Sequence, residues 1–237
     1  GVDLSFEWRY NSATTVTGAL GVGWSHSCQW FIDTTNRTTE GGIETSHRVT
    51  TGTGRRFSFI EEGDGSVRPS RDVPWVLDVS TNGYALRMEA GITASFDTNG
   101  LCHAMSDLWG QGISLVYSNA FPTQRLIRIE HSDGRSIAFA YTNNRIARVN
   151  SPSTNLWVCF GYSADGVLTN ASRHVGSAVE QLAYRVDEAA NVITQRINRV
   201  GRSFDYTYAQ SGGTSTRKGT GMRVDDTHYE HTLSYTA

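Results

Sequence analysis

The chain has 237 residues, of which 38% are hydrophobic and 11% aromatic, and its formal net charge is −2. That balance provides no broad basic surface for nucleic acid, and the aromatic content is too high for a disordered chain. Because of the charge balance, we expect no nucleic acid as a partner. No apolar run approaches the roughly 18 residues of a membrane-spanning helix, so we expect no membrane span either. With 24 glycines, the composition predicts folded β-structure with many polar turns.

Alternating apolar and polar residues, the pattern of a half-buried strand, begin near the first residue. Leu4–Tyr10 has this pattern, and Arg56–Phe59 and Leu126–Glu130 repeat it. Dipeptides that tolerate the positive φ angles of tight hairpins occur at Asn82-Gly83, Asn99-Gly100, Asp133-Gly134 and Asp165-Gly166. The strongest helical window, Val175–Arg185, has flanks that fit strands better. The sequence therefore predicts antiparallel hairpins.

An aromatic residue recurs about every 22 residues in the second half of the chain. The spacings are 21, 24, 21, 22 and 22 residues, and the members are Phe96, Tyr117, Tyr141, Tyr162, Tyr184 and Tyr206. Between successive members, a polar turn, an alternating strand, a second turn and a strand that ends in the aromatic residue follow in the same order. Each repeat therefore predicts one β-hairpin, with these aromatic residues as its structural repeat positions.

Hairpins of this kind are marginal alone and become stable when they lie side by side. We therefore predict an all-β fold of tandem hairpins in a curved antiparallel sheet. The chain divides into an N-terminal β segment at 1–60, a connecting β segment at 61–95, hairpin repeats at 96–208, and a degenerate repeat or linker at 209–237.

Two sequence patterns indicate a family. Tyr117 is followed by Arg125-Leu126, Asp133-Gly134 and Tyr141, and similar strings begin at Tyr162 and Tyr184. Ahead of them, Tyr10-Asn11-Ser12 leads into Gly18-Ala19-Leu20-Gly21-Val22-Gly23-Trp24. The first pattern resembles the YD repeats of the RHS (rearrangement hotspot) family, and the second resembles the segment that precedes those repeats. The resemblance covers about residues 3–208. The Asp that usually follows Tyr directly is mostly missing, and Ala190 replaces a usual glycine.

The resemblance implies a spiral β-sheet that forms part of a shell around a chain segment, as in RHS, Tc-toxin C and teneurin proteins. It implies an exported or cell-surface bacterial protein whose partners are the rest of a longer parent chain or an enclosed toxin or cargo segment. Gly1 leads directly into strand-like sequence, so we expect the chain to begin inside a longer protein. The self-cleaving core motif of many family members is not found in this sequence.

No local motif indicates catalysis, a cofactor or a metal. His228 and His231 are three residues apart and would face opposite sides of a strand, and a structural role is favoured for His26. The acidic runs Glu61-Glu62-Gly63-Asp64 and Asp225-Asp226 sit in turn-like contexts that favour exposed turn acids. The glycines of Gly18–Gly23 lack the context of a phosphate loop and favour a closely packed turn.

The three cysteines, Cys28, Cys102 and Cys159, lack metal-ligand spacing. Small buried hydrophobic residues are the favoured interpretation, and one disulfide with one free thiol stays open.

Six tryptophans are many for this length, and structural roles in the sheet are favoured for them. Trp109 lies in the predicted turn Asp107–Gly112, which makes it the best candidate for contact with a ligand such as a glycan. Three hypotheses follow: a structural shell segment, a carbohydrate- or protein-binding surface module, and a polysaccharide-acting enzyme. The first predicts a polar and aromatic inner face, the second exposed Trp and Tyr, and the third a pocket of titratable groups with perturbed pKa values.

Overall fold

The computed structural model describes residues 2–12, 17–40, 42–70, 73–118, 124–187, 192–210, 217–224 and 230–232. These residues form antiparallel β-sheets and one short 3₁₀ turn, Glu89–Gly91, so the predicted all-β class is confirmed. No helix in this described part is long and apolar enough to cross a membrane. The chain divides into two compact units: unit 1 contains residues 1–8 and 26–138, and unit 2 contains residues 9–25 and 139–237.

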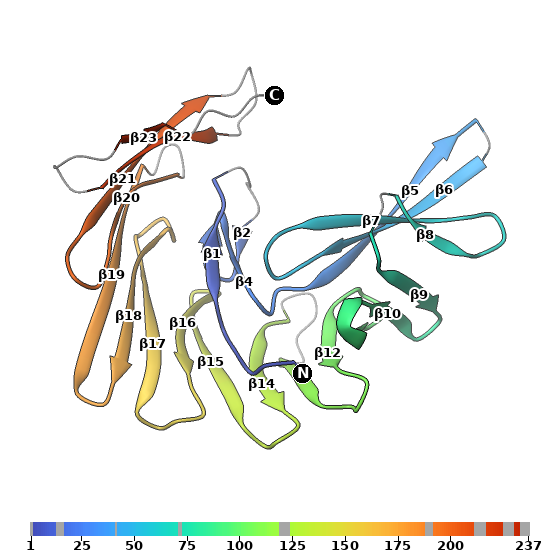
Figure 1. Cartoon of the computed structure of the whole chain (residues 1–237), viewed down its shortest axis with the longest axis horizontal. Helices are drawn as coiled ribbons and strands as arrows, with labels where there is room; N and C mark the ends of the chain where they lie inside the picture. The colour runs from blue at the N-terminus through green and yellow to red at the C-terminus, as the bar shows by residue number, and fades with distance from the viewer. Residues whose placement is uncertain are drawn as a thin grey trace. The chain divides into compact units, whose positions relative to one another are not determined.

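Unit 1 begins with a four-stranded antiparallel sheet and continues into hairpins (Figure 1). The four strands are β5 (Phe31–Thr39), β6 (Gly42–Thr50), β7 (Arg56–Glu61) and β8 (Val67–Pro69). The hairpin strands are β9 (Val76–Ser80), β10 (Gly83–Arg87), β11 (Thr93–Phe96), β12 (Cys102–Ser106), β13 (Gly112–Tyr117) and β14 (Leu126–His131). Fully buried apolar side chains, among them Val49, Phe59, Leu86 and Phe96, form the core of this unit.

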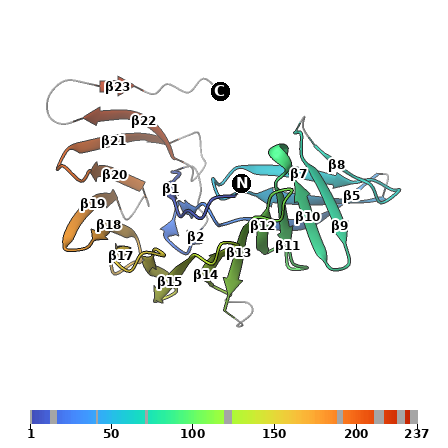
Figure 2. The same ribbon diagram turned by 60° about the horizontal axis from the view of Figure 1, so that its bottom comes forward.

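Unit 2 consists of further hairpins and a short N-terminal ladder. Its hairpin strands are β16 (Arg145–Asn150), β17 (Leu156–Tyr162), β18 (Leu168–Val175), β19 (Ala178–Asp187), β20 (Val192–Ile197), β21 (Ser203–Gln210), β22 (Arg217–Val224) and β23 (Glu230–Thr232). The ladder pairs β2 (Thr17–Gly18) with β3 (Gly21–Val22). Figure 2 shows β17 to β22 arranged in an arc within this unit, with β2 inside the arc.

Three strands contain residues of both units. They are β15 (Ser136–Thr142) and the paired strands β1 (Trp8–Tyr10) and β4 (Trp24–His26). From β9 to β23 the hydrogen-bonded order of the strands is the chain order. This order is the arrangement that tandem hairpins predict.

A five-residue turn recurs between the hairpin strands. In one copy, the Asp97 N–H donates to the Leu101 carbonyl (3.0 Å), the Gly100 N–H donates to the Asp97 carbonyl (2.9 Å), and Gly100 has φ +77°. The Asp97 carboxylate accepts from the N–H groups of Asn99 (3.0 Å) and Leu101 (2.8 Å). Asp or Asn suits the first position because its side chain bonds the backbone two residues on, and glycine suits the fourth because it adopts positive φ without strain.

The same turn recurs at residues 107–111 and 198–202. Asp107 and Asn198 occupy the first position, and their side-chain oxygens accept from the third and fifth N–H groups. Gly110 (φ +76°) and Gly201 (φ +81°) occupy the fourth position. The recurring Gly of the sequence repeat is therefore the fourth residue of this turn, two residues before the returning strand begins.

Candidate functional site

The six aromatic repeat positions all lie on hairpin strands, but they do not share one structural phase. Phe96, Tyr117 and Tyr162 are the last residues of β11, β13 and β17, and a β-bulge immediately precedes each. Tyr141 lies one residue before the end of β15. A bulge adds one residue to a strand and increases its local twist. In the three hairpins of Phe96, Tyr117 and Tyr162, the bulge lies at the last residue of the strand that ends in the aromatic residue.

In the last two repeats the bulge lies two residues beyond the aromatic position inferred from spacing. The register shifts between Arg185 and Val186 in β19 and between Thr207 and Tyr208 in β21. Tyr184 and Tyr206 therefore lie inside their strands rather than at the bulge. Tyr184 is 8% exposed and belongs to the core of unit 2.

Three tyrosines at the bulge close their hairpins with a hydroxyl bond. The hydroxyl of Tyr117 donates to the Cys102 carbonyl at 2.9 Å, that of Tyr162 to the Ile146 carbonyl at 2.7 Å, and that of Tyr208 to the Ile193 carbonyl at 2.7 Å. Each bond runs from the bulge near the end of the second strand back to the first or second residue of the first strand of the same hairpin. We call this contact the tyrosine clasp.

Sequence reasoning found two of the clasp residues and missed Tyr208, because a constant 22-residue step from Tyr184 leads to Tyr206. The turn glycine would have been the better reference point. Seven residues separate Gly110 from Tyr117 and Gly201 from Tyr208, and the same interval separates Gly134 from Tyr141. Burial raises the pKa of Tyr162 and of Tyr208 well above its usual value, which keeps both hydroxyls protonated as donors.

Unit 2 holds a segment of its own chain against its hairpin strands. We call this segment, residues 9–25, the strap; its described residues are 9–12 and 17–25, and they contain the Tyr10-Asn11-Ser12 and Gly18–Trp24 strings. The Ile193 N–H donates to the Tyr10 hydroxyl oxygen at 3.3 Å, and the Trp24 ring meets the Tyr184 ring edge-on with centroids 5.0 Å apart. The rings of Tyr10 and Trp24 are 5.3 Å apart. One aromatic cluster thus joins both ends of the strap to β19 and β20.

The glycine-rich middle of the strap packs against β16 of the same unit. The Ile146 N–H donates to the Ala19 carbonyl at 2.9 Å, and the Arg145 guanidinium donates to the Gly18 carbonyl at 3.2 Å. A Cβ on Gly21, where φ is +106°, would lie 3.3 Å from the Gly166 carbonyl. The glycines therefore allow close backbone approach, as the sequence predicts.

Unit 1 contains a polar cluster around the buried His47, which sequence reasoning did not single out. His47 is 2% exposed, and its Nδ1 is 2.9 Å from the Thr34 hydroxyl, which is 3.1 Å from the Tyr84 hydroxyl. On the other side of the ring, Nε2 is 3.4 Å from a Glu61 carboxylate oxygen, and no hydrogen bond in the described structure satisfies it. Thr34 is exposed. A carboxylate, an imidazole and a hydroxyl in this order resemble a proton relay, although no pattern in local sequence could have revealed it, because the four residues come from β5, β6, β7 and β10.

A second aromatic group lies on the surface of unit 2. The rings of Trp157 and His174 are stacked at 4.9 Å with an interplanar angle of 11°, and the Arg148 guanidinium lies 4.7 Å from the centre of the Trp157 ring. Trp157 pairs directly with His174 across β17 and β18. Cross-strand stacking of this kind stabilises strand register.

Trp109, the predicted ligand contact, lies in the turn between β12 and β13 with 80% of its surface exposed. Its neighbour Leu108 is 77% exposed. The Asp107 carboxylate accepts from the Trp109 N–H at 2.9 Å, so the turn backbone is fixed while the indole faces solvent. The other predicted site residues lie elsewhere in the sheets and do not gather around this ring.

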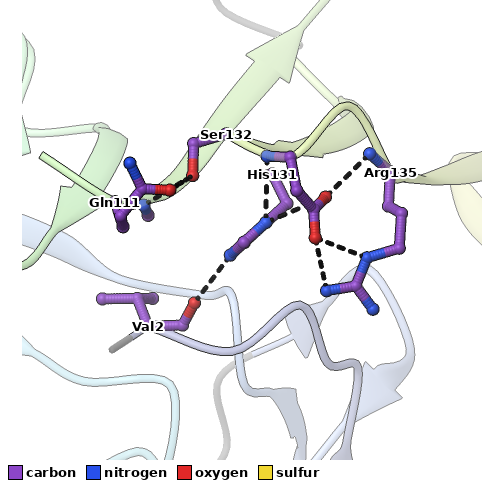
Figure 3. A network of polar contacts seen from close by, with 7 residues as sticks. Val2, Gln111, His131, Ser132 and Arg135 are labelled. Atoms are coloured by element: carbon purple, nitrogen blue, oxygen red, sulfur yellow. Dashed lines mark hydrogen bonds and ion pairs between the residues drawn. The ribbon is translucent and has the colours of Figure 1, made fainter.

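The remaining histidines have separate environments. His26 is 5% exposed, its ring centroid is 5.4 Å from that of Phe6, and burial lowers its pKa to about 4. His131 belongs to a network at the turn between β14 and β15 (Figure 3). Its Nε2 is 3.2 Å from the Val2 carbonyl, while Nδ1 is 3.0 Å from the Asp133 carboxylate. Hydrogen bonds from Arg135 hold the pKa of Asp133 far below its usual range.

His228 and the Asp225-Asp226 pair lie outside the described residues, as does the His231 side chain. Within the described part of the chain, no three His, Cys, Asp or Glu side chains gather as a metal site. In the other acidic run, the Asp64 carboxylate accepts from the Ser66 N–H at 2.9 Å, and Glu62 pairs with Arg68.

All three cysteines are free thiols. Burial raises the pKa of Cys28 to about 11 and that of Cys102 to about 12, whereas Cys159 is partly exposed. Cys28 and Cys102 thus behave as small buried residues, the favoured interpretation of the sequence.

Comparison with known proteins assigns no family. No family model matches the chain, and no curated protein matches it. A porin-like protein from Bacteroides uniformis is among the solved structures that align with it, at 11% identity and a TM-score of 0.39, over 84% of this chain and 96% of that one. A likeness of this strength carries no argument about function.

Proposed function

We propose that the chain is a structural segment of an exported bacterial RHS-type β-shell, whose hairpin sheet encloses or displays a polypeptide partner or toxin segment. The observation that carries the proposal is the strap. A glycine-rich polypeptide already lies against the hairpin strands of unit 2, fixed by Tyr10 to β20 and by Trp24 to β19. A sheet built from self-contained hairpins can be extended by adding further copies, which suits a wall.

The strap contacts are also the kind that an enclosed chain needs. Ala19 meets Ile146 through a backbone hydrogen bond, and the Trp24 ring meets the Tyr184 ring edge-on. Backbone contacts hold a chain with little dependence on its side chains. The same surface chemistry therefore suits variable partner segments.

The test is protease protection of the protein isolated from its native cells. After purification, the sample is digested before and after unfolding in urea, and mass spectrometry identifies the cleaved peptides. The proposal expects the protein in the medium or at the cell surface, together with polypeptide outside residues 1–237 that is cleaved only after unfolding. A cytosolic protein with no protected polypeptide beyond the strap would reject it.

One observation favours a second candidate, a carbohydrate- or protein-binding surface module. Trp109 is held on a fixed turn with its ring 80% exposed, and exposed aromatic rings are common anchors of binding sites. A glycan array probed with the native chain and with W109A tests this candidate, with I43A, also at an exposed apolar side chain, as the matched control. Glycan binding that is lost in W109A and retained in I43A would favour the module over the shell.

A further inference from the structure

One face of β18 to β21 carries an arginine cluster with too few carboxylates. Arg173 pairs with Glu180 across β18 and β19, and Tyr184 pairs with Arg196 across β19 and β20. Glu180 and Tyr184 are four residues apart on the same strand, with no bulge between them, so they point to the same side. Trp24 of the strap contacts Tyr184, which identifies this side as the face that the strap covers in part.

Two of the arginines share a single acid. The Arg173 guanidinium is 3.2 Å from Glu180 Oε2, and the Arg199 guanidinium is 2.9 Å from the same oxygen. One carboxylate therefore faces two cations, and all three side chains remain about 40% exposed at 38%, 40% and 44%. This part of the face has a positive excess and is open to solvent.

Arg196 increases that excess, because it has no acid partner in the described structure. Its guanidinium lies 4.5 Å from the centre of the Phe204 ring, and its cross-strand neighbour on the other side is Tyr184. Its Nε is buried without a hydrogen-bond acceptor. The Phe204 ring fixes the position of this guanidinium, which preorganises it for an acceptor that comes from outside.

The strap does not supply that acceptor. Residues 9–25 contain no Asp or Glu, so the polypeptide already on this face adds no acid to Glu180, the one carboxylate that the described structure pairs with any of the three arginines.

We propose that the arginine face, defined by Arg173, Arg196 and Arg199, binds an acidic stretch of polypeptide. Planar guanidinium groups match carboxylates in bidentate geometry, and the neighbouring part of the same face already accommodates polypeptide. The inference rests on the proposed function and makes it more specific, because the enclosed segment must carry Asp or Glu where it passes β18 to β21.

The experiment titrates the 237-residue chain with a short fluorescein-labelled peptide rich in Glu, and with the same peptide carrying Gln in place of Glu. Fluorescence anisotropy reports Kd at low and at high salt. We expect the Glu peptide to bind at least about tenfold more tightly than the Gln peptide, with the difference reduced by salt. Equal affinity for the two peptides would overturn the proposal.

Variants locate the site. R196Q and the double variant R173Q/R199Q should each weaken Glu-peptide binding by at least about fivefold. R87Q is the control, because Arg87 is an exposed arginine paired with Asp78 in unit 1, and its Kd should change by less than about twofold. Thermal unfolding confirms that each variant is folded. Because Arg199 is exposed, R199Q alone provides a second reading if R196Q does not fold. If both R173Q/R199Q and R196Q bind the Glu peptide with unchanged affinity, the assignment is refuted. If R196Q does not fold, unchanged affinity in R199Q refutes it instead.

Three further outcomes separate the possibilities. Tighter and arginine-dependent binding of polygalacturonate than of the Glu peptide would replace the polypeptide with an acidic glycan and overturn the proposal as stated. A protease-protected segment whose retention is unaffected by the arginine variants would leave the shell function intact and refute only the acidic-segment inference. Absence of both protection and peptide binding would remove both.

Discussion

Removal of the Tyr208 hydroxyl tests whether the clasp, rather than the aromatic spacing of the sequence, defines the repeat. Tyr208→Phe keeps the ring and deletes the hydroxyl that donates to the Ile193 carbonyl at 2.7 Å. Tyr206→Phe is the matched control two residues earlier in β21, because the described structure gives the Tyr206 hydroxyl no hydrogen bond. The two variants remove the same atom from one strand.

The expected difference follows from the net value of a hydrogen bond. A single intramolecular bond contributes about 1 kcal/mol to stability. Tyr208 is only partly buried, so water can reach the carbonyl that is left, and the penalty should stay near that value. We expect Tyr208→Phe to lower the free energy of unfolding by about 1 kcal/mol and Tyr206→Phe to change it by less than about 0.5 kcal/mol.

Urea unfolding followed by tryptophan fluorescence and by circular dichroism measures both variants against the parent protein. With an m-value of roughly 2.5 kcal/mol/M, the midpoint for Tyr208→Phe should fall by about 0.4 M. The two probes should agree on the transition that contains β21. An equal or larger loss in Tyr206→Phe would refute the clasp as the repeating element.

Three other predictions concern packing, protonation and thiols. Gly112→Ala should lower the free energy of unfolding in urea by about 3 kcal/mol, because the new Cβ would overlap the Met105 carbonyl. Gly134→Ala is the control: the space around Gly134 is open but its φ is +87°, so the free energy of unfolding should fall by only about 1 kcal/mol. Burial lowers the pKa of His26 to about 4, so the unfolded chain binds the proton first and stability should fall as the pH drops from about 6.5 toward 4. The urea midpoint of a His26→Leu variant should depend less on pH over this range. The same pH dependence in the variant and the parent protein would contradict this. Under native conditions at pH 8, Ellman's reagent should modify Cys159 faster than either buried cysteine, and rapid reaction of all three thiols would disprove the burial.

Local sequence was sufficient for the hairpins, because the chemistry of each turn is contained within five residues. Asp97 supplies the acceptor and Gly100 the positive φ, and both can be recognised in the sequence. The dipeptides Asn99-Gly100 and Asp133-Gly134 mark the correct places, although they occupy the third and fourth positions of a five-residue turn. The predicted type of connection was therefore simpler than the observed one.

Non-local features escaped prediction for two physical reasons. A bulge shifts the register by one residue without a fixed sequence signature, so the step from Tyr184 led to Tyr206 instead of Tyr208. The His47 cluster and the arginine face depend on strands that meet only after folding: His47 meets Tyr84, and Arg173 meets Arg199 through Glu180. Residue types at those positions look like ordinary surface alternation in the sequence.

The strap also has a consequence for biosynthesis. Tyr10 leaves the ribosome early, yet its hydroxyl accepts from the backbone of Ile193, 183 residues further along the chain. At translation rates of about 5–20 residues per second, the first aromatic anchor waits roughly 10 to 35 seconds for its partner. During that interval the tyrosine and tryptophan rings are uncovered, so a nascent-chain chaperone has a defined period in which to engage them.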